Sequence, residues 1–208
     1  MKTYPGLPEP RAEVLVDYES SRPRYQNKSE FLIASLHLCG NTGTYVDAPI
    51  HRFRGGADLA ALPLERLADL RIELIDASHA GRALSLEMID GRDVRGRAVL
   101  FRTDFSLSFG TDRYFRDNPF LTAELCTDLV ARGASFVGID SLNIDDVEDF
   151  VRPAHTTLLG AGIPVCEHMT NLAALAGAGN ARLHAVPIAW RGGTTFPVRA
   201  YALSAEKG

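Results

Sequence analysis

Short runs of aliphatic, β-branched and aromatic residues recur along the whole chain, and they limit the possible folds more than any other feature of the sequence. Runs of this composition are typical of buried strands. They lie at residues 31–38, 71–77, 98–103, 135–139, 163–165, 184–190 and 196–203. Helical patterns stand between them, so the sequence predicts an α/β or α+β fold with a covered sheet.

The clearest helical pattern covers residues 123–132, where apolar side chains recur at the spacing of one helical face. Thr122 can cap the first turn of this helix, and Gly133 can end it. Shorter helices are expected at residues 64–70, 155–159 and 172–176. The predicted strands thus outnumber the predicted helices, and the two alternate along the chain.

The composition is that of an ordinary globular domain, with 208 residues, 46% of them hydrophobic and 23% charged. Glycine and proline are spread throughout, and the chain shows no low-complexity linker, charge block or internal repeat. The sequence therefore predicts a single domain that covers residues 1–208.

The charge balance and hydropathy exclude several classes of partner. A formal net charge of −4 leaves no basic surplus to neutralise a phosphate backbone, so nucleic acid is not expected to bind. No apolar run approaches the ~20 residues that span a bilayer, and the first residues lack the apolar segment of a signal peptide. We therefore expect a cytoplasmic protein with reduced cysteines, no membrane partner and a small-molecule substrate.

Three familiar motifs are incomplete in this chain. Residues 160–162 lack the third glycine of a dinucleotide loop, and residues 133–135 lack a glycine of the nucleophile elbow. The acidic stretch at 140–146 lacks the glycine and the final glutamate of a calcium loop, so we expect a solvated loop that caps a helix.

The most unusual stretch lies at residues 41–51. In an extended chain, alternation places Asn41, Tyr45 and Asp47 on one face, and a proline then ends the strand and brings His51 nearby. One face thus collects an amide, a phenol, a carboxylate and an imidazole. The alternative is a polar turn in which Asp47 accepts hydrogen bonds from backbone amides.

A second polar pair lies downstream. Glu167 follows a short apolar strand, and His155 opens a predicted helix. Both are positions where α/β proteins place functional residues, although a lone His or Glu at the boundary of an element is more often a helix cap or a surface group.

Taken together, these segments resemble the cyclase family, which contains bacterial-type kynurenine formamidases and isatin hydrolases. The specific motif is a strand of the form H-x-G-T-H-x-D-x-P-x-H, which corresponds to residues 41–51. The order of further segments agrees with the family at residues 99–103, 138–141, 154–159, 163–167 and 171–172. The resemblance implies an α/β fold, namely a swivelling β/β/α domain whose mixed sheet is covered by helices. It also implies a homodimer or higher homo-oligomer.

The resemblance also implies a divalent metal site. Asp47, His155 and Glu167 match metal-ligand positions, and His51 matches the position that transfers protons. Asn41 and Tyr45 stand where the family has two histidines. One imidazole and two carboxylates suit Mn²⁺ at least as well as Zn²⁺, so either ion is expected as the cofactor.

The leading hypothesis is a metal-dependent, arylformamidase-like hydrolase of a small amide or lactam, with a place in tryptophan catabolism. His51 would move a proton, Tyr45 would donate to the oxyanion, and Asn41 would bind the substrate. Two alternatives remain open. One is a metal-free acid–base cyclase or dehydratase in which Asp47 orients His51, and the other is a non-catalytic small-molecule binding protein of the same fold.

Overall fold

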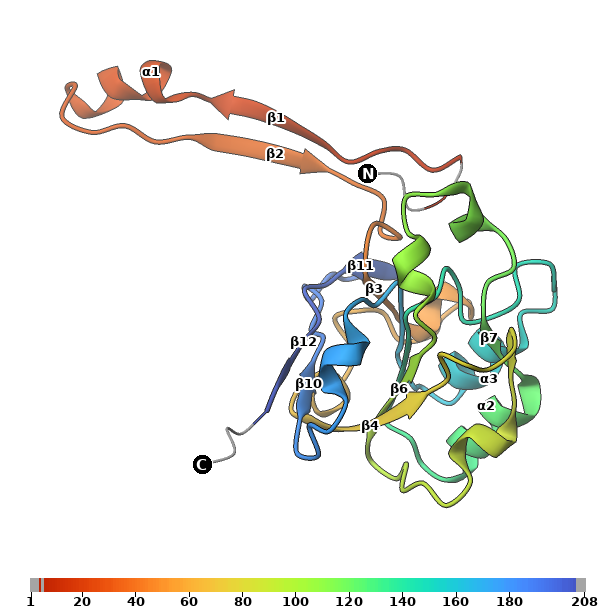
Figure 1. Cartoon of the computed structure of the whole chain (residues 1–208). Coiled ribbons are helices and arrows are strands. Elements are labelled where there is room, and N and C mark those ends of the chain that lie inside the picture. The colour runs from red at the N-terminus through yellow and green to blue at the C-terminus, as the bar shows by residue number, and fades with distance from the viewer. Residues whose placement is uncertain (1–3, 5, 205–208) are drawn as a thin grey trace. The chain divides into compact units, whose positions relative to one another are not determined.

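The computed structural model describes Tyr4 and residues 6–204 of the chain (Figure 1). By its internal contacts the chain divides into two compact units, Met1–Gly43 and Thr44–Gly208. The prediction of one domain over residues 1–208 therefore stays a prediction, and the two units are described one by one.

The first unit is built on a two-stranded antiparallel ribbon of β1 (Arg11–Val16) and β2 (Ile33–His37), with an irregular register between Val14 and Val16. The connection contains the short helix α1 (Tyr18–Ser21), which begins with a capping box at Asp17, and the 3₁₀ helix η1 (Arg22–Tyr25). Strand β2 falls within the run predicted at residues 31–38.

The prediction of an extended strand over residues 41–47 is wrong for the first part of that stretch. Residues 40–44 form bends, and only β3 (Tyr45–Asp47) is a strand. The backbone reason lies at Gly43, whose φ of +66° belongs to the left-handed region and breaks the extended conformation. The alternation of side chains therefore starts at Tyr45.

The second unit is organised around an eight-stranded mixed sheet of order β11-β3-β9-β8-β6-β4-β10-β12. Strands β4 (Leu70–Asp76), β6 (Ala98–Arg102), β8 (Phe136–Ile139) and β9 (Val165–Glu167) run parallel. Strands β3, β10 (Arg182–His184), β11 (Thr195–Pro197) and β12 (Tyr201–Leu203) pair antiparallel at the two sides. A separate parallel pair is formed by β5 (Ala83–Leu84) and β7 (Phe120–Leu121).

The helices include α2 (Ala123–Ala131) and α3 (Pro153–Gly160). Thr122 caps α2 by accepting from the Leu125 N–H, which confirms the predicted start of this helix. Short 3₁₀ turns make up the remaining helical segments: η2 (Pro49–His51), η3 (Leu64–Arg66), η4 (Leu86–Ile89), η5 (Phe105–Ser108), η6 (Asp112–Phe115) and η7 (Leu172–Leu175). Two helices expected near residues 64–70 and 172–176 are thus single turns.

Two predicted strands near the C-terminus differ from the structure. The run at residues 184–190 leaves the sheet after His184, and it contains Pro187, which has no N–H to donate to a ladder. The run at residues 196–203 is split into β11 and β12, which lie at opposite edges of the sheet.

Two apolar layers enclose the sheet. Val99 and Phe101 of β6 face the cluster that includes α2 and α3, whereas Ala98 and Leu100 face a second cluster that includes residues of η7 and of the loop before η3. This alternation confirms the predicted α/β class with a mixed sheet that helices cover (Figure 1). Within the described residues, no helix is long and apolar enough to cross a membrane.

Candidate active site

The candidate site lies on the face of the sheet that α2 and α3 cover. On β3, Val46 belongs to the opposite core cluster, so its neighbours Tyr45 and Asp47 point toward the helices. On β9 the same alternation turns Glu167 to the helical face, because Cys166 belongs to the opposite cluster. The antiparallel register sets Tyr45 directly opposite Glu167.

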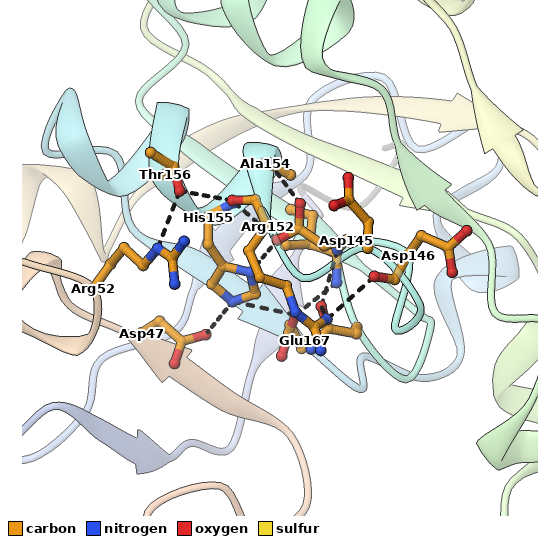
Figure 2. Close-up of polar contacts among 12 residues, drawn as sticks. Asp47, Arg52, Asp145, Asp146, Arg152, Ala154, His155, Thr156 and Glu167 are labelled. Carbon is orange, nitrogen blue, oxygen red and sulfur yellow. Dashed lines mark hydrogen bonds and ion pairs between the residues drawn. The ribbon is translucent and has the colours of Figure 1, made fainter.

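Helix α3 adds His155 to this group, and Asp145 orients it. The Asp145 carboxylate accepts from the backbone N–H groups of Ala154 at 2.6 Å and of His155 at 3.1 Å. The same carboxylate lies 2.6 Å from His155 Nδ1. Because a carboxylate only accepts, Nδ1 carries a proton, and Nε2 is the nitrogen that faces the other acidic residues. Figure 2 shows the imidazole between Asp145 and the pair formed by Asp47 and Glu167.

The acidic stretch at residues 140–146 was expected to be a solvated, helix-capping loop. Capping is confirmed, since Asp145 bonds the first turn of α3. Solvation is wrong for Asp140 and Asp145, which are 1% and 0% exposed. Asp140 accepts from the backbone and hydroxyl of Thr103 and from the Asp104 N–H, which compensates for its burial.

Three potential ligand atoms of Asp47, His155 and Glu167 lie within 4.8 Å of one another. His155 Nε2 is 3.8 Å from Asp47 Oδ2 and 3.6 Å from Glu167 Oε1. Both Asp47 oxygens are buried, and neither has a hydrogen-bond partner among the described residues. A buried carboxylate without donors is costly unless a cation neutralises it, so this donor set fits a divalent metal.

The charges in this cluster shift the pKa values of His155 and Glu167. Burial lowers the pKa of His155, but the carboxylates of Glu167, Asp145 and Asp47 outweigh it and raise the pKa to about 10. Burial, together with the charge of Asp47, raises the pKa of the Glu167 carboxyl above its ordinary value. Perturbed groups that converge on one buried point are typical of functional sites.

His51 lies at the rim of the cluster. Its Nε2 is 3.9 Å from Asp47 Oδ1, and its ring centroid is 5.8 Å from that of His155. Burial lowers the pKa of His51, and the negative charge of Asp47 opposes that effect. The next residue, Arg52, donates to Thr156 Oγ1 at 3.0 Å and to the Val151 carbonyl at 2.8 Å. Through these hydrogen bonds, Arg52 connects the turn that carries His51 to the helix that carries His155 (Figure 2).

The structure brings together most of the residues singled out from the sequence, namely Tyr45, Asp47, His51, His155 and Glu167. Asn41 belongs to the first unit, and its predicted contact with the substrate stays a prediction. The sequence did not predict that Asp145 orients His155, or that Arg52 forms hydrogen bonds with Thr156 and Val151. The only signal for Asp145 was its place in the expected helix-capping loop.

Comparisons with known proteins show the family of this chain. The Cyclase family model matches residues 3–146. The chain is 31% identical over 182 residues to a kynurenine formamidase of Salinibacter ruber, which covers 85% of this chain and 82% of that protein. It is 28% identical over 200 residues to a kynurenine formamidase of Bacillus cereus, which covers 95% of this chain and 89% of that protein.

A solved structure shares the fold as well. Isatin hydrolase A from Labrenzia aggregata, bound to benzyl benzoate, superposes with a TM-score of 0.81 at 25% identity, covering 98% of this chain and 86% of that one. The fold of this chain is therefore the α/β fold of that solved hydrolase. The chain belongs to the cyclase family.

Proposed function

We propose that this protein is a metal-dependent hydrolase of a small amide or lactam, similar to the arylformamidases. The observation that carries the proposal is the buried group of Asp47, His155 and Glu167, whose ligand atoms lie within 4.8 Å. The similarity to kynurenine formamidases and to isatin hydrolase A supports the same activity, and a role in tryptophan catabolism fits the former. The metal-free alternative is not favoured.

Asp47, His155 and Glu167 would hold the metal, with Asp145 fixing the ring of His155. Two carboxylates and one imidazole form an oxygen-rich donor set, which suits Mn²⁺ as well as Zn²⁺. When bound, a divalent metal polarises the amide carbonyl and makes water a better nucleophile at neutral pH.

His51 is the group we assign to proton transfer. Its lowered pKa keeps the imidazole neutral at pH 7, so the ring can take a proton from the attacking water and return it to the leaving nitrogen. Asp47 lies 3.9 Å from His51 Nε2, close enough to stabilise the imidazolium that forms. Oxyanion stabilisation by Tyr45 and substrate binding by Asn41 stay predictions.

The test combines metal content with activity. Elemental analysis of the purified protein, after incubation with Mn²⁺ or Zn²⁺, is expected to show about one metal ion per chain that is lost in Asp47→Ala and His155→Ala. Asp146→Ala is a matched control, because Asp146 is in the same loop as Asp145 but pairs with Arg82. Hydrolysis is then assayed with N-formyl aryl amines and an aryl lactam. A parent protein that binds neither ion refutes the proposal.

We also propose that the protein is a cytoplasmic homodimer or higher homo-oligomer. All three cysteines are free thiols, as expected in a reducing compartment.

The proposal of a homo-oligomer is supported by the ribbon of β1 and β2, in which the side chains of Val14, Leu15 and Leu36 are each more than half exposed. A two-stranded ribbon with exposed apolar side chains gains stability when another surface covers it. Light scattering coupled to size exclusion measures the mass, and a monomer at micromolar concentration contradicts this proposal.

A further inference from the structure

The hydroxyl group of Tyr45 is engaged with an acidic residue of the candidate site. Tyr45 is 1% exposed, and its Oη lies 2.5 Å from Glu167 Oε2. A phenol has one proton, and an ionised carboxylate can only accept, so Tyr45 is the donor. Hydrogen bonds to a charged acceptor are among the stronger ones in proteins, particularly when they are buried.

The second oxygen of Glu167 has its own donor. Oε1 accepts from the backbone N–H of Ile144 at 2.6 Å, and it lies 3.6 Å from His155 Nε2. The carboxylate is therefore held from two directions, by β3 through Tyr45 and by the loop after β8 through Ile144. This double contact sets the orientation in which Oε1 faces His155.

The ring of Tyr45 is itself confined. It packs against the ring of His168, with centroids 5.4 Å apart and planes tilted by 50°. Strand pairing fixes its backbone on both sides, against Pro197 of β11 and Glu167 of β9. A buried, paired and packed tyrosine is a rigid support for the carboxylate that it contacts.

We propose that Tyr45 is a positioning residue for Glu167 and stands outside the set of metal ligands. This inference rests on the proposed function and deepens it. Its hydroxyl holds Glu167 so that Oε1 points toward His155 and Asp47, which prepares the three-ligand site before an ion arrives. The competing account is the oxyanion donor, in which Tyr45 contacts the substrate.

The experiment compares Tyr45→Phe with Tyr114→Phe. Tyr114 is equally buried, but its hydroxyl lies 2.8 Å from His168 Nδ1, so it controls for the loss of a buried hydroxyl. Dissociation constants for Mn²⁺ and Zn²⁺ are measured by calorimetry on the full chain, and kcat and KM are measured at low and saturating metal. Circular dichroism verifies that each variant is folded.

A positioning role predicts that Tyr45→Phe raises the metal dissociation constant about 10- to 100-fold, as for other residues that orient ligands. It also predicts that saturating metal restores most of kcat in Tyr45→Phe. For Tyr114→Phe, the metal dissociation constant is expected to stay within about threefold of that of the parent. An unchanged dissociation constant combined with a kcat that saturating metal does not restore overturns the inference and supports the oxyanion donor.

The failure of the proposed function can be told apart from the failure of this inference. A parent protein that binds neither ion refutes the function. Crystal structures of the parent and of Tyr45→Phe without metal then decide the inference by themselves. A Glu167 side chain that turns away from Ile144 in the variant supports positioning by Tyr45, and one that keeps its place overturns it.

Discussion

His155 Nδ1 lies 2.6 Å from Asp145 Oδ2, and this contact decides which ring nitrogen faces Asp47 and Glu167. The carboxylate also bonds the first turn of α3, so the orientation of the ring and the start of the helix depend on the same side chain. A ligand histidine that donates its other N–H to a carboxylate is held in one tautomer and gains basicity.

Replacement of Asp145 by asparagine is expected to weaken metal binding about 10- to 100-fold, because the amide carries no charge to support the imidazole. Calorimetric titration with Mn²⁺ or Zn²⁺ measures this change. Asp146→Asn is the control, since Asp146 pairs with Arg82 and lies 21% exposed. Equal affinities for the parent and Asp145→Asn would show that Asp145 acts only as a helix cap.

Replacement of His51 by glutamine is expected to lower kcat about 10²- to 10⁴-fold, the usual contribution of a general acid–base group, and to leave the metal content unchanged. Burial lowers the pKa of His51, and a neutral ring is needed as the base, so activity of the parent should fall only at a pH below the ordinary titration range of histidine. Rates measured from pH 5 to 9 at saturating metal should lose this acidic limb in the variant. An unaltered profile would assign the proton to another group.

Metal affinity is expected to rise with pH. The carboxylates around His155 outweigh the effect of burial and hold its pKa near 10, so at lower pH a proton occupies the nitrogen that an ion needs. Each pH unit below 10 then costs about a factor of ten in apparent affinity through this one proton. Calorimetry at pH 6.5, 7.5 and 8.5, in buffers of different ionisation enthalpy, counts the protons released. A pH-independent affinity would contradict the proposed ligand.

Stability should depend on α2 where it packs on the sheet. Leu129 is fully buried in the cluster under α2, so Leu129→Ala is expected to reduce the free energy of unfolding by about 2–5 kcal/mol. Leu107, which is 84% exposed, provides the matched control. Leu107→Ala should change the free energy of unfolding by less than about 0.5 kcal/mol. Urea denaturation without metal compares the two, and similar losses would contradict the packing.

Local patterns predicted the elements whose formation depends on near neighbours. The helix at Ala123–Ala131 was recognisable because its apolar spacing and the Thr122 cap lie within one short segment. Strand β6 was recognisable because its first four residues, 98–101, are all apolar and face the two core clusters in turn. The prediction of a strand after His184 is wrong for the opposite reason. The composition of this run is strand-like, yet none of the strands in the described part of the chain pairs with it.

The amino-acid sequence by itself determined the fold class, the family and the candidate residues Tyr45, Asp47, His51, His155 and Glu167, because these depend on residue type and order along the chain. The tertiary structure alone decided how they meet. Tyr45 and Glu167 are 122 positions apart, and only the antiparallel register of β3 and β9 sets the phenol on the carboxylate. Asp145 likewise gains its role only when burial removes water and leaves His155 as the partner for its charge.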